Sequence, residues 1–270
     1  MESLFSGVLY WLVDHPAISH YEWKQGQTFG SSPAFVAAAV TAYLFTTLFL
    51  RHYGDLRPLS SAVLRRITAA HNVFLCLLSL AMAAGCSLAV LRQVPAGDWS
   101  WVVCFPAGRT PPHGPTFFWA HVAYFSKILE FADTLLILLS GPRGVRRLTF
   151  LHLYHHSLVV VTSYLGLATS QTMLPVGIVT NAAVHVVMYA YYLLTGLGHR
   201  PRWKRAVTEC QIVQFVFAFV VSGLMLYYHF TGSGCSGIWA WCFNAVFVAS
   251  LLALFLNFHN TNYNPKNKEP

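Results

Sequence analysis

Residues 151–160 read LHLYHHSLVV, and the apolar run that they open continues to about residue 168. An imidazole that is buried without a hydrogen-bond partner is costly. On a helix, His152, His155 and His156 fall on a face about 100° wide, so all three rings look into the same space. The stretch therefore predicts a helix that turns three histidines toward an enclosed polar site.

The composition places this helix in a lipid bilayer. The chain has 270 residues, of which 56% are hydrophobic and 10% charged, whereas soluble domains carry roughly 25% charged residues. A span needs about 20 mostly apolar residues, and the apolar segments lack the period-two alternation of membrane barrels. We therefore predict an all-α membrane protein with seven transmembrane helices, forming a single domain over residues 1–270. The predicted spans are residues 34–50, 67–91, 117–139, 148–168, 174–194, 206–230 and 237–258.

The basic residues indicate how the helices are oriented. Thirteen of the 17 lysines and arginines fall in the tail or in the loops after the first, third and fifth predicted spans. By the positive-inside rule these parts are cytosolic. Residues 1–32 then form a lumenal or interfacial segment, which lacks the basic leader of a cleaved signal peptide, and residues 259–270 form a cytosolic tail. The net charge of +8 reflects this orientation and not the binding of nucleic acid.

Two cysteines and two lysines lie at opposite faces of the predicted membrane. Cys104 and Cys235 fall in external loops, on the oxidising side, so a disulfide between them is expected. The chain ends in KNKEP, where Lys266 and Lys268 resemble a dilysine retrieval signal of the endoplasmic reticulum. The predicted location is therefore the membrane of the endoplasmic reticulum, with the N-terminus lumenal and the C-terminus cytosolic.

The third predicted span carries charges at membrane depth. Lys127, Glu130 and Asp133 are three residues apart and wind along one side of a helix, with Thr134 four residues after Glu130. A charge at mid-membrane costs roughly 2.5–3.5 kcal/mol on insertion scales. These groups should therefore face the bundle interior, where Lys127 pairs with one or both carboxylates.

The fifth and sixth predicted spans carry aligned polar stripes as well. Their members recur at spacings of three or four residues, and Tyr191 lies off the stripe and is expected to pack. The stripes consist of Asn181, His185, Met188, Tyr189 and Tyr192 in the fifth span and of Thr208, Gln211 and Gln214 in the sixth. Four successive helices with polar stripes predict a polar chamber enclosed mainly by helices three to six.

Three classes of function are compatible with such a chamber. The histidines could hold a metal, as in a membrane lipid oxygenase or hydrolase, although one cluster with His185 and two carboxylates supplies few ligands for two irons. They could instead transfer an acyl group, because neutral imidazole is a nucleophile toward thioesters. A seven-helix receptor or transporter is the third class.

Four motifs, in this order, resemble the fatty-acid elongase family, the membrane-embedded very-long-chain 3-oxoacyl-CoA synthases of the endoplasmic reticulum. They are KILEFADT at 127–134, LHLYHH at 151–156, NAAVHVVMYAYY at 181–192 and TECQIVQ at 208–214. No position in these motifs departs from the family's pattern. The N-terminal YWLVDHPAISHYEW (residues 10–23) most resembles plant-type members.

The resemblance implies an acyltransferase reaction. A long-chain acyl-CoA condenses with malonyl-CoA, carbon dioxide and CoA leave, and a 3-oxoacyl-CoA two carbons longer results. No metal or redox cofactor is implied. The implied partners are the two CoA substrates and the lipid bilayer. The reductases and dehydratase of the elongation cycle, and a homo- or hetero-oligomer, remain open as further partners.

The motifs also imply roles for single residues. We expect a histidine of the cluster His152, His155 and His156 to take the acyl group, with His155 favoured because it lies at the centre. His185 and Asn181 are expected to stabilise the enolate or to position malonate. The other expected substrate-binding residues are Lys127, Glu130, Asp133, Thr134, Met188, Tyr189, Tyr192, Thr208, Gln211, Gln214 and the basic residues Arg143, Arg146, Arg147, Arg202 and Lys204.

Overall fold

The fold is all-helical in a computed structural model that describes residues 2–53, 60–146 and 148–263. Beyond helices, the described residues contain two isolated β-bridges, between Glu22 and His113 and between Pro106 and Cys235. The α-helices are α1 (Glu2–Leu9), α2 (Pro16–Ser19), α3 (Pro33–Tyr53), α4 (Ser61–Gln93), α5 (Pro115–Leu129), α6 (Phe131–Leu139), α7 (Pro142–Val145), α8 (Phe150–Ala168), α9 (Leu174–Gly196), α10 (Lys204–Thr231) and α11 (Ile238–Tyr263). A π-helix (Tyr10–Asp14) and a 3₁₀-helix (Trp99–Val102) complete the elements.

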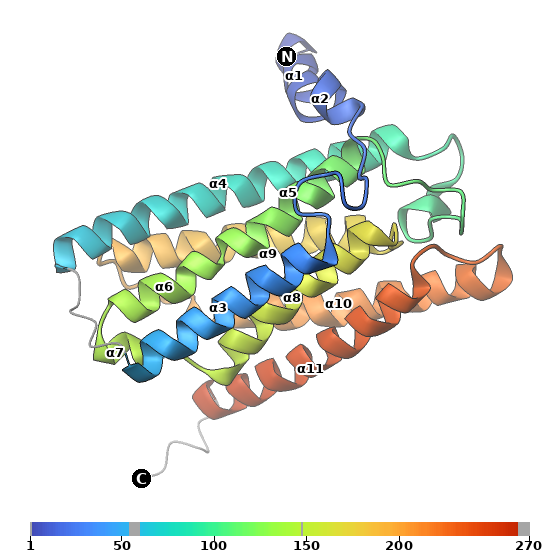
Figure 1. The fold of residues 1–270 in the computed structure, drawn as a ribbon. Helices are drawn as coiled ribbons and strands as arrows, with labels where there is room; N and C mark the ends of the chain where they lie inside the picture. Colours follow the sequence, from blue (N-terminus) through green and yellow to red (C-terminus); the bar gives the residue numbers. More distant parts are fainter. Residues whose placement is uncertain (1, 54–59, 147, 264–270) are drawn as a thin grey trace.

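The predicted membrane class is confirmed by the length and apolarity of the helices. Among the described residues, five helices are long and apolar enough to span a membrane, namely α3, α4, α9, α10 and α11. The third predicted span corresponds to α5 and α6, which follow one another along one line (Figure 1). We expected a single continuous helix there. That prediction is wrong, because the α-helical pattern is interrupted at Glu130.

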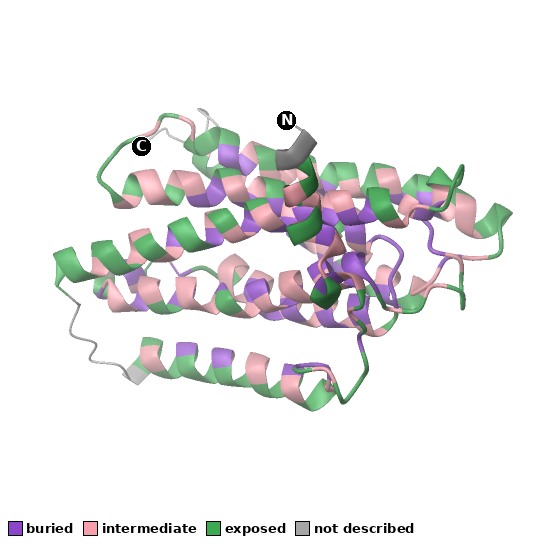
Figure 2. Cartoon of the chain, turned by 90° about the horizontal axis from the view of Figure 1, so that it is seen from above, coloured by how far each residue is buried: buried purple, intermediate pink, exposed green. Residues whose placement is uncertain are grey.

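Six of the long helical segments close into a ring. Packing contacts connect α4 to α9, α9 to α10, α10 to α11, α11 to α8, α8 to α5 and α5 back to α4. The helix α3 lies outside this ring. Among the described elements, its main packing partners are α6 and α8. It is the separate rod along the lower edge of Figure 2.

One end of the ring is filled by a solid apolar core. Its buried side chains include Met82 of α4, Phe117 of α5 and Leu167 of α8, and each has at most 2% of its surface exposed. The N-terminal segment is held to this end because Trp119 Nε1 donates to the Leu12 carbonyl at 2.8 Å. The chamber that could hold a ligand lies in the opposite half of the bundle.

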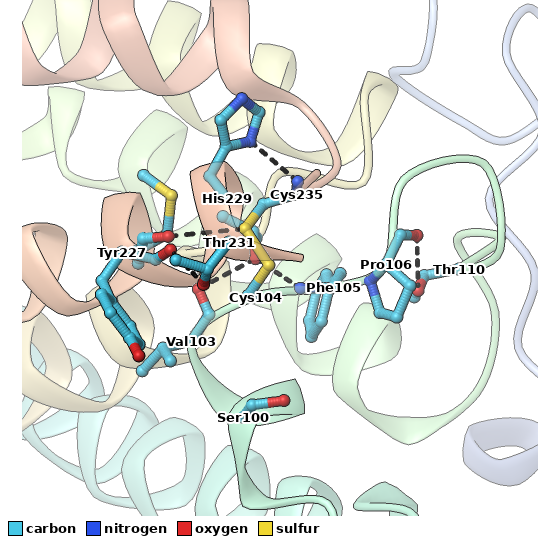
Figure 3. Close-up of a disulfide and its surroundings, with 12 residues drawn as sticks. Ser100, Val103, Cys104, Phe105, Pro106, Thr110, Tyr227, His229, Thr231 and Cys235 are labelled. Atoms are coloured by element: carbon cyan, nitrogen blue, oxygen red, sulfur yellow. Dashed lines mark hydrogen bonds between the residues drawn. A yellow bond between two sulfur atoms is a disulfide. The ribbon is translucent and has the colours of Figure 1, made fainter. Parts of the chain in front are cut away.

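A disulfide ties the loops of the filled end together. Cys104 and Cys235, for which the topology predicted a bond, are joined through their sulfur atoms (Figure 3). The Cys235 backbone N–H donates to His229 Nδ1 at 2.8 Å, and the buried Thr172 hydroxyl accepts from Phe105 N and donates to the Val103 carbonyl. The predicted signal at Lys266 and Lys268 lies outside the described residues.

Replacing Gly85 with alanine is expected to lower the melting temperature of the protein in detergent micelles. A Cβ at Gly85 would lie 2.1 Å from the nearest atom of the Trp119 ring, so the ring must move and weaken its bond to Leu12. Overpacking of this kind typically costs about 1–3 kcal/mol.

The matched control for this prediction is Gly177→Ala on α9, where an added Cβ meets no atom of the described structure within 4 Å. Its melting temperature should not fall. Equal melting temperatures for the two variants would contradict the packing described for Trp119.

Candidate active site

A chamber of about 660 Å³ occupies the half of the ring opposite the solid core. It extends from the helix ends at Ser140, Gly196 and Lys204 inward as far as Asn72 and Asn181. Its walls come from α4, α6, α8, α9, α10 and α11. The expected enclosure by helices three to six is therefore incomplete, because α4 and α11 close the ring and contribute Asn72 and Phe255 to the wall.

Most of the residues that the sequence analysis singled out line this one chamber. Those found in its wall are Glu130, Asp133, His152, His155, His156, Asn181, His185, Met188, Tyr189, Tyr192, Lys204, Thr208, Gln211 and Gln214. Tyr191, expected to pack, does so against Trp203 with ring centroids 5.2 Å apart, yet it also reaches the wall. The polar stripes of four helices thus converge on a common space.

Lys127 lies behind the wall and forms a buried ion pair with the wall residue Glu130. Lys127 Nζ donates to Glu130 Oε1 at 2.8 Å and to Asn181 Oδ1 at 2.7 Å, and the two charged side chains are 6% and 2% exposed. His185 Nδ1 lies 3.5 Å from Nζ and 3.3 Å from Oε1. The pair therefore occupies Nδ1 of His185 and the carbonyl oxygen of Asn181, which leaves Nε2 and the amide nitrogen for a ligand.

A chain of hydroxyl groups holds the first histidine of the cluster. His152 Nε2 lies 2.7 Å from Thr134 Oγ1, which in turn lies 3.0 Å from the Tyr43 hydroxyl on the outer helix α3. Thr134 itself is not among the wall residues, and its contact with substrate stays a prediction. It connects the cluster to α3, and the sequence analysis missed Tyr43 because its helix showed no polar stripe.

The other two histidines of the cluster retain unpartnered nitrogens. Within the described residues, Nδ1 of His155 and Nδ1 of His156 are buried and have no hydrogen-bond partner. The His156 ring lies 4.4 Å from the His152 ring and 5.4 Å from the His155 ring, centroid to centroid. Buried polar atoms in native proteins are normally satisfied. An exception at a chamber wall points to a ligand or a reacting group.

Asp133 binds partners on two other helices. Its Oδ1 accepts from His71 Nε2 of α4 at 2.8 Å, and its Oδ2 accepts from the Tyr189 hydroxyl of α9 at 2.9 Å. Of the two carboxylates with which Lys127 was expected to pair, one or both, the described contacts show the pairing with Glu130. His71 was not predicted as a partner of Asp133, because a contact across 62 residues leaves no local signal in the sequence.

The basic residues expected to contact CoA divide into two groups. Lys204 lies in the chamber wall, at the first residue of α10. Arg146 and Arg202 lie near the same end but are not wall residues. The side chain of Arg143 and the whole of Arg147 lie outside what the structure describes. On α10, Gln211 Nε2 contacts Met188 Sδ at 3.6 Å, so two of the predicted stripes meet directly.

Replacing Thr134 with valine is expected to lower turnover about tenfold, the effect of one lost hydrogen bond near a reacting group. Valine keeps the shape of threonine but leaves His152 Nε2 and the Tyr43 hydroxyl without their shared partner. Thr134→Ser keeps the hydroxyl and should stay near the wild-type rate when turnover is measured in the same way. A serine variant as slow as the valine variant would show that shape, and not the hydroxyl chain, matters at this position.

Comparisons with known proteins agree with the resemblance of the motifs. Residues 28–270 match the ELO: GNS1/SUR4 family. A protein of Arabidopsis thaliana named "Fatty acid elongase 3-like" is 29% identical over 97% of this chain and 94% of its own length. "Fatty acid elongase A" of Dictyostelium discoideum is 31% identical over 92% of this chain and 90% of its own length. "Very long chain fatty acid elongase 5" of Rattus norvegicus is 29% identical over 87% and 75%.

The fold and the chamber define a multi-pass membrane protein with a chamber between its helices, into which histidine, carboxylate and amide groups converge. Within that class, the chain belongs to the ELO (GNS1/SUR4) family of fatty acid elongases, as its four motifs predicted. The family expectation is confirmed over most of the chain.

Proposed function

We propose that this elongase joins a long-chain acyl-CoA to malonyl-CoA through an acyl-histidine intermediate. The observation that carries the proposal is the pair of histidines, His155 and His156, whose buried Nδ1 atoms have no partner among the described residues although they line a chamber. Such rings are available to react, whereas His152 and His185 are each bound through one nitrogen. The chain acts as a very-long-chain 3-oxoacyl-CoA synthase, which is an acyltransferase.

The first half-reaction transfers the acyl group. A ring nitrogen of His155 attacks the thioester carbonyl of the acyl-CoA, the carbon–sulfur bond breaks, and CoA leaves as the thiol with the proton that the imidazole releases. His156, whose ring lies 5.4 Å from that of His155, lies close enough to carry this proton. The apolar wall residues Phe215, Phe255 and Phe258 offer a surface for the alkyl chain.

The second half-reaction forms the carbon–carbon bond. Malonyl-CoA loses carbon dioxide, the electrons of the broken bond form an enolate, and the enolate carbon attacks the acyl-imidazole. The carbon–nitrogen bond then breaks, and the ring nitrogen that leaves takes up a proton from water, carried by His156, which regenerates neutral His155. Two groups bind the enolate oxygen: the amide N–H of Asn181, because Lys127 holds its carbonyl oxygen, and Nε2–H of His185 in the tautomer whose Nδ1 accepts from Lys127.

The position of the chamber supports cytosolic delivery of both CoA substrates. It reaches the bundle end that carries Lys204 and the basic loops, and the positive-inside rule assigns that end to the cytosol. CoA phosphates bind there to Lys204, Arg202 and Arg146. We infer seven crossings of the endoplasmic reticulum membrane in one domain, with α5 plus α6 and α8 supplying the two crossings beyond the five long apolar helices. The reductases and dehydratase of the cycle then receive the 3-oxoacyl-CoA product on the same face.

The proposal is tested with purified protein and two substrate additions. Long-chain acyl-CoA alone should add the mass of one acyl group to the intact protein, and later addition of radiolabelled malonyl-CoA should release it as labelled 3-oxoacyl-CoA. Normal turnover with no adduct at any time would discard the acyl-histidine intermediate. Stoichiometric iron or zinc in active protein, with activity lost on chelation, would instead support the metal-dependent alternative.

A further inference from the structure

His71 of α4 is bound to the chamber wall, yet no role in the proposed reaction has been given to it. Its Nε2 lies 2.8 Å from Oδ1 of Asp133, and since a carboxylate only accepts, His71 is the donor. The other oxygen of Asp133 accepts from the Tyr189 hydroxyl at 2.9 Å. One carboxylate of α6 therefore bonds to both α4 and α9, which are neighbours in the ring.

We propose that His71 is a positioning residue for the malonyl-CoA half-reaction, acting through Asp133 and Tyr189 on His185. The inference rests on the proposed function, in which His185 binds the enolate oxygen. It adds to that function a residue outside the four motifs, and it assigns this residue to one of the two half-reactions.

The carboxylate of Asp133 needs a partner at membrane depth. Lys127 directs its ammonium group to Glu130, Asn181 and His185, and within the described residues it forms no hydrogen bond to Asp133. The side chain of Asp133 is 19% exposed and that of His71 15%, so water supplies little of the solvation that the carboxylate needs. A charged group at membrane depth requires a partner. His71 is the basic side chain that Asp133 contacts.

Asp133 holds the Tyr189 ring in place beside His185. Tyr189 is fully buried, and its hydroxyl is committed to Asp133. The Tyr189 ring meets His185 edge-on, with centroids 5.6 Å apart and an interplanar angle of 77°. With His71 absent, Asp133 would lose one of its two donors and be free to turn, and the Tyr189 ring beside His185 would lose its anchor.

His71 belongs to a different hydrogen-bond network from the one that holds the histidine cluster. The histidine cluster is held separately, through His152, Thr134 and Tyr43 on α8, α6 and α3. The network of His71 instead ends at His185 on α9. The two networks therefore support opposite halves of the proposed reaction, so a change at His71 should leave transfer of the acyl group to the cluster largely intact.

The test measures the two half-reactions separately in the wild type, His71→Leu and His71→Gln. Adduct formation from acyl-CoA alone, followed by intact mass, should stay within about twofold of wild type in both variants. Loss of the adduct after addition of malonyl-CoA should be about tenfold slower in His71→Leu. The rate should recover to within about threefold in His71→Gln, whose amide can still donate to Asp133.

His121→Leu is the matched control. His121 is another histidine within a long helix, it bonds to the Phe29 carbonyl, and it does not line the chamber among the described residues. Its half-reactions should match wild type. The combination of His71→Leu with Tyr189→Phe should be no slower than Tyr189→Phe alone, because both changes interrupt one network.

Three results would overturn the inference. The first is a malonyl-CoA step in His71→Leu as fast as in wild type. The second is an equal fall of both half-reactions in His71→Leu and His71→Gln together with a lower melting temperature, which describes a purely structural residue. The third is a wild-type protein that forms neither adduct nor product, which refutes the proposed function itself and this inference with it.

Discussion

Replacing His155 with alanine is expected to lower the condensation rate on the order of 1,000-fold, within the range of a lost group that acts directly in catalysis. The variant should also form no acyl adduct when it meets acyl-CoA alone. Alanine is the best helix former, so α8 should persist. The measurements are labelled malonyl-CoA incorporation, intact mass, and the melting temperature as a check on folding.

Single substitutions at other histidines test whether this effect is specific to His155. His156→Ala should slow adduct formation without abolishing it, since we assign His156 to proton transfer. His121→Ala, outside the chamber, should behave as wild type. An adduct that persists in His155→Ala but disappears in His156→Ala would transfer the nucleophile's role to His156. Wild-type rates in all three single variants at His155, His156 and His185 would refute acyl transfer through imidazole.

The helices were predicted well because a membrane span must be apolar along most of its length, and the hydropathy of a window of residues detects that property. Each of the seven predicted apolar segments lies, to within two residues, in a helix or in the α5–α6 pair of the structure. The break at Glu130 was missed. Neither proline nor glycine marks it, and Glu130 N bonds to the Ser126 carbonyl while Asp133 N bonds to the Glu130 carbonyl at a spacing of three. Such a local tightening leaves no trace in hydropathy.

The candidate site was predicted where its partners are close in the sequence. Lys127 and Glu130 are three residues apart on one helix face, so their pairing followed from helical geometry alone. The bond of Tyr43 to Thr134 spans 91 residues, and that of His71 to Asp133 spans 62. These contacts depend on how each helix is rotated and shifted in the ring. A single sequence without its packing does not contain that information.

Replacing Lys127 with methionine is expected to destabilise the protein by about 3–5 kcal/mol, the usual effect of removing one partner from a buried ion pair. Glu130 is 2% exposed and would keep a charge with no lysine beside it. The melting temperature in detergent should fall clearly. The exposed pair of Arg205 and Glu209 supplies the control, since Arg205→Ala removes a contact that water and salt already screen, and its melting temperature should change far less.

The double variant Lys127→Met with Glu130→Gln separates the structural from the catalytic role of the pair. Replacing both charges together often restores stability, because no unpaired charge remains buried. We expect the melting temperature to recover most of its loss, while turnover stays at least about tenfold below wild type. Without the ammonium group, the Asn181 carbonyl oxygen and His185 Nδ1 lose their donor. That donor orients the amide nitrogen of Asn181 and Nε2 of His185 toward the enolate. A double variant that regained wild-type turnover would show that Lys127 only neutralises Glu130, and the enolate site would then have to be built from other groups of the wall.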